Sequence, residues 1–205
     1  MAEGLVAEGL VAATQPRPQA DAAEAPPRGE GRLAALEWST SILAVDSLRF
    51  GEADGEQVTL SGPFVASEAL AQVGYVAGVV RPLVVRLGVG GWSAVAAREG
   101  DASGGFALRA GLGAGVAIPT PDVDVVLEHA FDFVALPLET EERFLSAYRV
   151  DLGTRVAVRG CLPAGLALEG SYTGGPSLAL GGEIGHTHAV GVAVVADESL
   201  KDRCK

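Results

Sequence analysis

The sequence predicts an all-β protein, an eight-stranded antiparallel up-and-down (meander) β-barrel with a disordered N-terminal leader. Three observations predict this fold. Apolar residues alternate with polar or small residues over long runs, which is the period of a two-faced strand. Eight such runs lie between residues 33 and 196. Tight proline-containing connections alternate with longer connections rich in Gly, Asp and Glu, as expected of a barrel with turns at one end and loops at the other.

Composition narrows the class of protein. The chain has 205 residues, of which 48% are hydrophobic, and it carries 28 glycines and a net charge of −11. This length suits one domain of moderate size. The negative charge argues against nucleic acid as a partner, because phosphates require a basic surface. No apolar run approaches the ~20 residues of a membrane helix, so the hydrophobicity comes from dispersed, alternating residues.

Residues 1–32 differ from the rest of the chain. The sequence Ala-Glu-Gly-Leu-Val occurs twice at its start, and a Pro-, Ala- and Glu-rich stretch follows. Such a composition cannot build a core, so we expect a flexible leader. We do not expect it to serve as a signal peptide, because it has no basic start and Glu3 and Glu8 interrupt its apolar residues. The barrel is expected over 33–196 and a polar C-terminal tail over 197–205.

Each strand is expected where every second residue is apolar. The expected strands are 33–45, 66–80, 83–97, 106–118, 123–133, 143–159, 166–173 and 186–196. The residues that mark the apolar face are, in strand order, Leu36 and Trp38, Val73 and Tyr75, Val85 and Leu87, Leu108 and Leu112, Leu127 and Phe131, Val150 and Leu152, Leu166 and Leu168, and Val190 and Val192.

Glycine, proline and acidic residues mark the connections between these strands. The second strand is placed after Pro63 because proline argues against a central strand. The expected tight turns are Arg81-Pro82, 119–122 and 161–165. The expected surface loops are 46–65, 98–104, 137–142 and 174–185.

The two faces of these strands differ in a way that favours a membrane barrel. One face is apolar, whereas the other mixes glycine and alanine with opposite charges. A membrane barrel turns its apolar face to lipid and holds paired charges in its lumen. The predicted strands are also longer than the ~5–6 residues of a typical soluble strand and reach the ~9–11 that a tilted spanning strand needs.

This orientation assigns residues to each face. We expect the lipid face to include Leu108, Leu112, Val116, Val125, Leu127, Phe131, Phe133, Val150, Leu152 and Val156. We expect a lumen charge network of Glu37, Arg86, Arg109, Glu128, Asp132, Arg149, Asp151, Arg155 and Glu169. An eight-stranded barrel is only wide enough for its own side chains, so the favoured interpretation is that these charges pair and fill the lumen. Lining a pore or binding a polar ligand is the alternative.

The chain resembles the small, eight-stranded outer-membrane β-barrel proteins of Gram-negative bacteria. The resemblance covers about residues 33–196 and is carried by two glycine-rich segments with proline turns, 108–119 and 152–170. It implies a porin-like transmembrane β-strand protein of the cell envelope, located in the outer membrane. It further implies a structural or loop-mediated binding role, with the lipid bilayer and an unidentified loop-bound molecule as partners.

A soluble barrel is the alternative fold. A lipocalin-like barrel or β-sandwich in the periplasm or outside the cell would turn the Val/Leu/Phe face inward and bind an apolar small molecule. Arg149 and Arg155 would then lie in water. The many glycines and alanines on the charged face argue against this alternative, because small residues relieve crowding in a narrow lumen and a solvated face does not need them.

Candidate chemical groups are few. His186 and His188 share a strand face, but a metal site needs at least a third ligand and nothing ties His129 to them, so no metal is expected. No nucleophile motif surrounds any serine, and we expect neither enzymatic activity nor a cofactor. Cys161 and Cys204 are expected at the same end of the barrel, one strand apart, where they could form a disulfide or remain free thiols.

Overall fold

The structure is a computed structural model that describes residues 29–51, 57–95, 104–120, 123–139, 144–163, 166–180 and 182–200. Its strands are β1 (Glu30–Ala44), β2 (Ser47–Gly51), β3 (Gln57–Ser61), β4 (Phe64–Ala77), β5 (Val80–Ala94), β6 (Gly104–Pro119), β7 (Val123–Glu139), β8 (Phe144–Leu162), β9 (Leu166–Ala179) and β10 (Ile184–Asp197). A short 3-10 helix, η2 (Glu198–Leu200), follows β10. Almost all of the predicted leader and most of the predicted tail lie outside the described residues.

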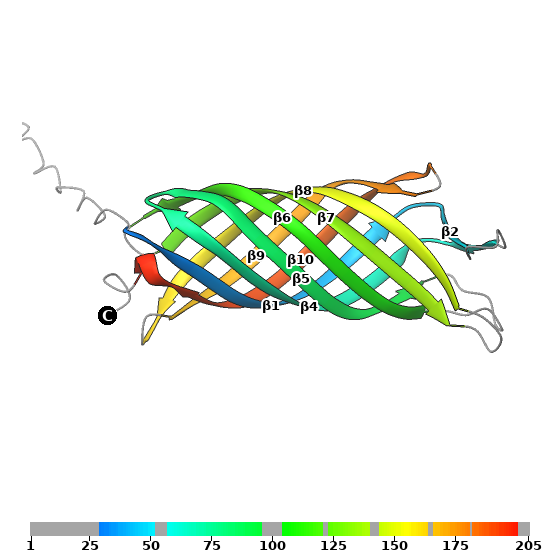
Figure 1. Cartoon of the computed structure of the whole chain (residues 1–205), viewed down its shortest axis with the longest axis horizontal. Coiled ribbons are helices and arrows are strands. Elements are labelled where there is room, and N and C mark those ends of the chain that lie inside the picture. The colour runs from blue at the N-terminus through cyan, green and yellow to red at the C-terminus, as the bar shows by residue number, and fades with distance from the viewer. Residues whose placement is uncertain are drawn as a thin grey trace, which may run out of the picture.

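Eight of these strands close into one antiparallel barrel. From β8, the pairing runs through β7, β6, β5, β4, β1 and β10 to β9, and each strand is antiparallel to the next. The pairing of β8 with β9 closes the ring. Figure 1 shows an elongated barrel whose strands run obliquely to its long axis, with the start of β1 and the end of β10 at the same end. This arrangement confirms the predicted fold class.

The two ends of the barrel carry different connections. The end where β1 begins holds the turns after β4, β6 and β8, and we call it the turn end. The opposite end, the loop end, carries β2 and β3, which pair with each other and attach to β8 at Gly51 and Ser146. In the described part of the chain, no helix is long and apolar enough to cross a membrane.

The β2–β3 hairpin corrects the prediction of a loop over 46–65. Each of its strands has five residues, too few for a clear alternating run beside so many Gly, Asp and Glu residues. Leu48 and Phe50 nevertheless alternate with polar neighbours and are buried, as is Leu60 on β3. The hairpin therefore belongs to the core at the loop end.

The first tight turn also lies elsewhere than predicted. The chain reverses at Gly78, whose φ of 60° is in the left-handed region that glycine adopts without strain. Arg81 and Pro82 instead lie within β5, where the register between β5 and β6 shifts between Arg81 and Val84. Proline cannot donate a ladder hydrogen bond, and such an irregularity is where a strand tolerates it.

The last two strands extend through residues that were predicted as loop or tail. β9 continues to Ala179, through Gly174, Gly175 and Pro176. A Cβ atom on Gly175 would lie 1.9 Å from the carbonyl oxygen of Leu152 on β8, so glycine is required there because the two backbones approach closely. Of the predicted loop 137–142, residues 137–139 belong to β7, and nearly all of the predicted loop 98–104 lies outside the described residues.

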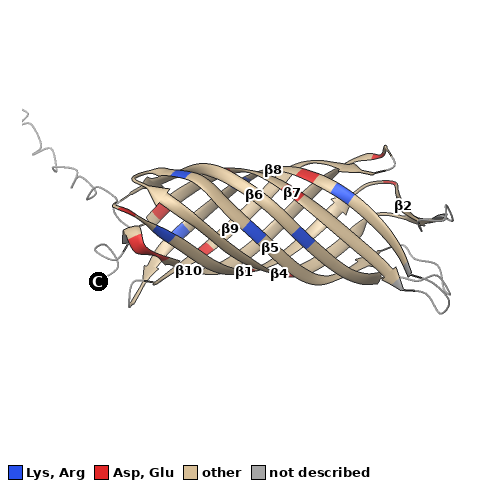
Figure 2. Cartoon of the chain, viewed as in Figure 1, with Lys and Arg blue, Asp and Glu red and all other residues tan. Residues whose placement is uncertain are grey.

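Inward and outward faces have opposite chemistry. Figure 2 shows where the charged residues lie along the barrel strands, and their burial places their side chains inside. Large apolar side chains are exposed on the outer face, among them Trp38 at 61%, Leu108 at 49% and Phe131 at 50%. Charged side chains are buried on the inner face. Apolar clusters also lie inside, a large one at the loop end that includes Phe50 and Trp92 and a smaller one at the turn end that includes Leu33 and Val195.

Glycines on the inner face allow neighbouring strands and inward side chains to approach closely. A Cβ atom on Gly115 would lie 2.1 Å from the backbone oxygen of Leu127. Because a backbone oxygen cannot move aside, Gly115→Ala is expected to lower the free energy of unfolding by about 1–3 kcal/mol. Gly170→Ala is the control, since a Cβ there meets nothing within 4 Å. Chemical unfolding in detergent micelles measures both, and equal stability of the two variants would contradict the predicted close approach.

Candidate functional site

The lumen is the candidate site, because it gathers charged side chains that alternate with the outward-facing apolar residues of the same strands. The buried charged residues of the barrel strands are Glu37, Glu68, Arg81, Arg86, Asp124, Glu128, Asp132, Arg149, Asp151, Arg155, Arg159, Glu169 and Asp197. Arg109 joins them with a side-chain exposure of 9%. Charges this deeply buried require partners, and the strands supply them in successive layers along the barrel axis.

The layer nearest the turn end is built around Arg159 of β8. Its Nη2 and Nε donate to Oε2 of Glu169, at 2.7 and 2.9 Å, and its Nη1 donates to Oδ2 of Asp197, at 2.7 Å. Glu169 lies on the neighbouring strand β9 and Asp197 ends β10, so one guanidinium joins three strands. Such a fork of donors suits two carboxylates at once.

The middle layer is built around two carboxylates. Glu37 on β1 accepts from Arg155 Nη2 at 3.0 Å and from Ser171 Oγ at 2.8 Å, and also from Gln72. The same Nη2 of Arg155 donates to Glu169 at 2.7 Å, which connects this layer to the previous one.

Glu128 on β7 is the second carboxylate of the middle layer. It pairs with Arg86 and, at 3.2 Å, with Nη1 of Arg81, both from β5. Glu128 is fully buried, so its charge depends on these two guanidinium groups from a single strand.

The layer toward the loop end is built around Arg109 of β6. Its guanidinium lies 2.8 Å from Glu68, 3.1 Å from Asp132 and 3.6 Å from Asp151. Asp151 also contacts Arg149 Nε at 3.3 Å and accepts from Ser177 Oγ at 2.5 Å. The carboxylates of β4, β7 and β8 thus meet at one cation.

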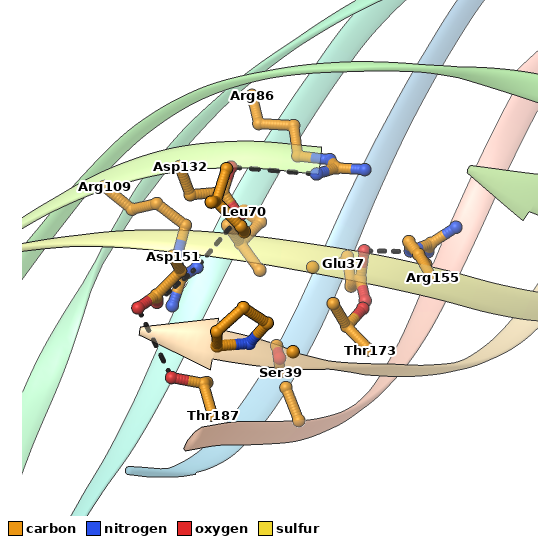
Figure 3. A pocket seen from close by; sticks show the side chains of 15 residues that line it. Glu37, Ser39, Leu70, Arg86, Arg109, Asp132, Asp151, Arg155, Thr173 and Thr187 are labelled. Carbon is orange, nitrogen blue, oxygen red and sulfur yellow. Dashed lines mark hydrogen bonds and ion pairs between the residues drawn. The ribbon is translucent and has the colours of Figure 1, made fainter. Parts of the chain in front are cut away.

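A small cavity of about 40 Å³ separates the middle layer from the loop-side layer. Figure 3 shows Glu37 and Arg155 on one side and Arg109, Asp132 and Asp151 on the other. A volume of this size holds roughly three water molecules. Within the described residues, Arg155 Nη1 and Asp132 Oδ1 have no hydrogen-bond partner, so water is the ligand whose size and polarity fit.

The structure brings all nine residues of the predicted network to the inner face, and each pairs with another of the nine. Sequence reasoning left out five further buried charges. Arg81 was assigned to a turn and Asp197 to the tail. Glu68 lies within the expected strand 66–80, on the face opposite Val73 and Tyr75. Arg159 and Asp124 share the inward alternation of Arg155 and Glu128, and that pattern could have identified them.

Charges fill only part of the lumen, which corrects the prediction that paired charges fill it throughout. At the loop end, Trp92 stacks on Phe50 at 5.1 Å between ring centroids and meets Phe64 edge-on at 5.9 Å. The indole Nε1 donates to the carbonyl oxygen of Pro137 at 3.1 Å. Leu136, Leu138 and Leu145 complete this apolar plug. Their inward alternation with Asp132 and Arg149 is visible in the sequence.

The ten residues predicted to face lipid lie on the outer face. Seven are exposed, and Val116, Val125 and Val150 are partly buried by neighbours. All three histidines share this face, and two of them have hydrogen-bond partners. His129 Nδ1 lies 3.2 Å from Thr154 Oγ1, and His188 Nδ1 lies 2.7 Å from the Tyr172 hydroxyl.

His186 is exposed on β10 near the loop end. It lines an open cleft of about 680 Å³ at the barrel mouth, together with Asp46, Pro63 and Glu183. Glu183 accepts from Ser47 Oγ at 2.8 Å, which joins the β9–β10 connection to the β2–β3 hairpin.

Cys161 is disulfide-bonded at the end of β8. Cys204, the possible partner named in the sequence analysis, lies outside the described residues.

Comparison with known proteins shows the fold. No protein-family model and no curated protein sequence matches the chain. Among solved structures, Neisserial surface protein A (NspA) superposes with a TM-score of 0.57 and 10% sequence identity, covering 82% of this chain and 98% of the other. The N-terminal β-barrel domain of Pseudomonas aeruginosa OprF gives 0.45, with 11% identity and coverages of 82% and 98%. An outer membrane channel from Pseudomonas putida F1 gives 0.25, with 13% identity and coverages of 87% and 98%. Of the three, NspA exceeds 0.5, so the fold comparison rests on it.

Proposed function

We propose that this chain is an outer-membrane β-barrel of a Gram-negative bacterium with a structural or loop-mediated binding role, and that it is neither a channel nor an enzyme. The observation that carries this proposal is the closed lumen. Ion pairs cross the lumen from β6 to β4, from β8 to β1 and from β8 to β10, and the apolar plug around Trp92 closes the loop end. Within the described strands, solutes therefore find no continuous path along the axis.

The orientation of the two faces supports the membrane location. Leu, Val, Ile and aromatic side chains are exposed around the whole ring, from Leu36 on β1 to Val194 on β10, whereas the ion pairs lie inside. In water, such a surface would far exceed the apolar patches of soluble proteins. A soluble lipocalin-like barrel has the reverse arrangement and an apolar interior for its ligand. The fold shared with NspA points the same way.

The loop end supports a binding role. The β2–β3 hairpin and the β9–β10 connection enclose the mouth cleft, and loops carried on a rigid barrel are where binding sites usually lie. The eight barrel strands are 14 to 19 residues long, which exceeds the ~9–11 that a span requires. The excess length lifts the loop end and its cleft beyond the lipid.

Conductance in planar lipid bilayers tests the proposal. The refolded full chain is expected to show no stepwise ion current, because the ion-pair layers and the plug lie in series. Phe50→Ala disturbs only the apolar plug, so this variant is also expected to show no stepwise ion current. Discrete openings from the unmodified chain would contradict a closed lumen. A heat-dependent gel shift, together with a requirement for detergent, checks in the same samples that the protein folds as a membrane barrel.

A further inference from the structure

The open cleft at the barrel mouth combines apolar lining with acidic side chains. Its volume of about 680 Å³ lies within the range of roughly 300–1,000 Å³ that small-molecule sites occupy. Val45, Pro63 and Ile184 contribute apolar surface to the lining, and Asp46 and Glu183 contribute carboxylates. None of the described residues that line the cleft is Lys or Arg. The cleft therefore suits a cation that also carries apolar surface.

One carboxylate oxygen of Glu183 lacks a donor. Its Oε1 accepts a hydrogen bond from the Ser47 hydroxyl at 2.8 Å. Its Oε2 is shielded from solvent, and within the described residues this oxygen has no hydrogen-bond partner. A shielded carboxylate oxygen without a donor is costly. A ligand that donates an N–H to Oε2 therefore gains a hydrogen bond without first displacing bulk water from that oxygen.

Backbone hydrogen bonds hold both acidic residues in place before any ligand binds. The amide of Ala179 donates to the carbonyl oxygen of Glu183 at 2.9 Å, and the amide of Gly182 donates to the carbonyl oxygen of Ala179 at 3.0 Å. These two bonds fix the turn between β9 and β10. The carbonyl oxygen of Asp46 accepts from the amide of Gly62 at 2.8 Å, which fixes the base of the β2–β3 hairpin. A site on such a backbone loses little conformational freedom when a ligand binds.

The sequence of the loop-end connections adds to the negative charge at the cleft. Residues 45–63, 95–103, 139–143 and 180–183 contain ten acidic residues and three arginines. Their net charge of −7 makes up most of the −11 carried by the whole chain. A field of this sign raises the local concentration of cations and steers them toward the mouth. Charge complementarity therefore selects a cation as the occupant of the cleft.

An organic cation fits the cleft better than a metal ion does. Within the described residues, no group of three or more His, Cys, Asp and Glu side chains is placed to hold a metal ion. An ammonium group needs no such shell, because its N–H groups donate to separate carboxylates. A hydrocarbon chain between two ammonium groups has Val45, Pro63 and Ile184 to lie against. His186, which is exposed at the same cleft, adds a further polar contact.

We propose that the mouth cleft binds an aliphatic polyamine, with its ammonium groups at Asp46 and Glu183 and its methylene groups against the apolar lining. The inference rests on the proposed binding role of the loop end, and it names the chemical class of the ligand. Because the carboxylates of the mouth attract the ligand from a distance, its affinity is expected to fall as the ionic strength rises.

Isothermal titration calorimetry of the full chain, refolded in micelles of an uncharged detergent, tests the proposal with two trivalent cations. Spermidine carries its charges on a hydrocarbon chain, whereas hexaamminecobalt(III) presents N–H groups without one. The field at the mouth attracts both ions alike. Spermidine is expected to saturate one site and to bind at least about tenfold more tightly than hexaamminecobalt(III). Equal affinities, or no saturable binding of spermidine, would overturn the polyamine site.

Substitutions at the cleft give a second measurement. Asp46→Asn combined with Glu183→Gln keeps the size of both side chains and removes their charges, so the dissociation constant for spermidine is expected to rise at least about tenfold. Glu30→Gln combined with Glu198→Gln removes the same charge from exposed residues at the turn end and is expected to leave the constant unchanged. Equal effects of the two pairs would overturn the site. Stepwise ion current, or absence of the heat-dependent gel shift, would instead contradict the proposed function.

Discussion

Replacing Arg155 with methionine is expected to lower the free energy of unfolding by about 3–5 kcal/mol. Arg155 is 2% exposed, and its Nη2 contacts Glu37 at 3.0 Å and Glu169 at 2.7 Å. Methionine fills much of the same space but leaves one of the carboxylates without a cation. Glu169 keeps Arg159, whereas Glu37 keeps only the neutral donors Gln72 and Ser171. The cost therefore falls mainly on Glu37.

This asymmetry makes the prediction specific. Adding Glu37→Gln to the Arg155→Met variant is expected to recover part of the lost stability, because it removes the charge that has no cation. Urea titration in detergent micelles, followed by the fluorescence of Trp38 and Trp92, measures both variants. Arg49→Met is the matched control on the exposed face of β2 and is expected to stay within about 0.5 kcal/mol. A loss below 1 kcal/mol for Arg155→Met would contradict the role of the ion pairs.

Phe50→Ala is expected to cost about 3–5 kcal/mol and to loosen the β2–β3 hairpin from the barrel mouth. Phe50 is fully buried, stacks on Trp92 and packs within the loop-end plug. Its truncation leaves a cavity between the hairpin and the barrel wall. Arg49 precedes it and is exposed, so trypsin cleavage after Arg49 reports the opening. We expect cleavage to be markedly faster in the variant than in the unmodified chain.

Val58→Ala is the control for this prediction. Val58 is the cross-strand partner of Phe50 but remains 40% exposed, so its truncation removes little buried area. We expect its stability and its cleavage rate to stay close to those of the unmodified chain. Equal cleavage rates for the two variants would show that the plug does not hold the hairpin.

The sequence was sufficient to predict the barrel because alternation is a local property. The residue spacing that sets Leu108 and Leu112 on one face and Arg109 on the other depends only on the period of a strand. The number of barrel strands and the order of their connections follow from the same runs. Local turn chemistry was a less reliable guide. Arg81-Pro82 resembles a turn, but the chain turns at Gly78. Pro82 lies within β5, where a shift in register accommodates the proline.

The contents of the lumen were predictable in kind but not in detail. Alternation alone places Glu37, Arg155 and Glu169 on the inner face. Their contact depends on the register between β1, β10, β9 and β8, because one residue of slippage would turn every side chain to the opposite face. The apolar plug escaped prediction for a similar reason. Leu48 and Phe50 come from a hairpin too short to show a period, and its position over the barrel mouth is set by packing.

By itself, therefore, the sequence determined an eight-stranded barrel with an apolar outside and a charged inside, since those features need only the two-residue period. Only the tertiary structure decided which charges pair, where the lumen turns apolar, and that His129 meets Thr154 while Tyr172 meets His188. These residues lie up to 59 positions apart in the chain. Strand register brings them together, and register depends on the pairing of neighbouring strands, which no single strand reveals.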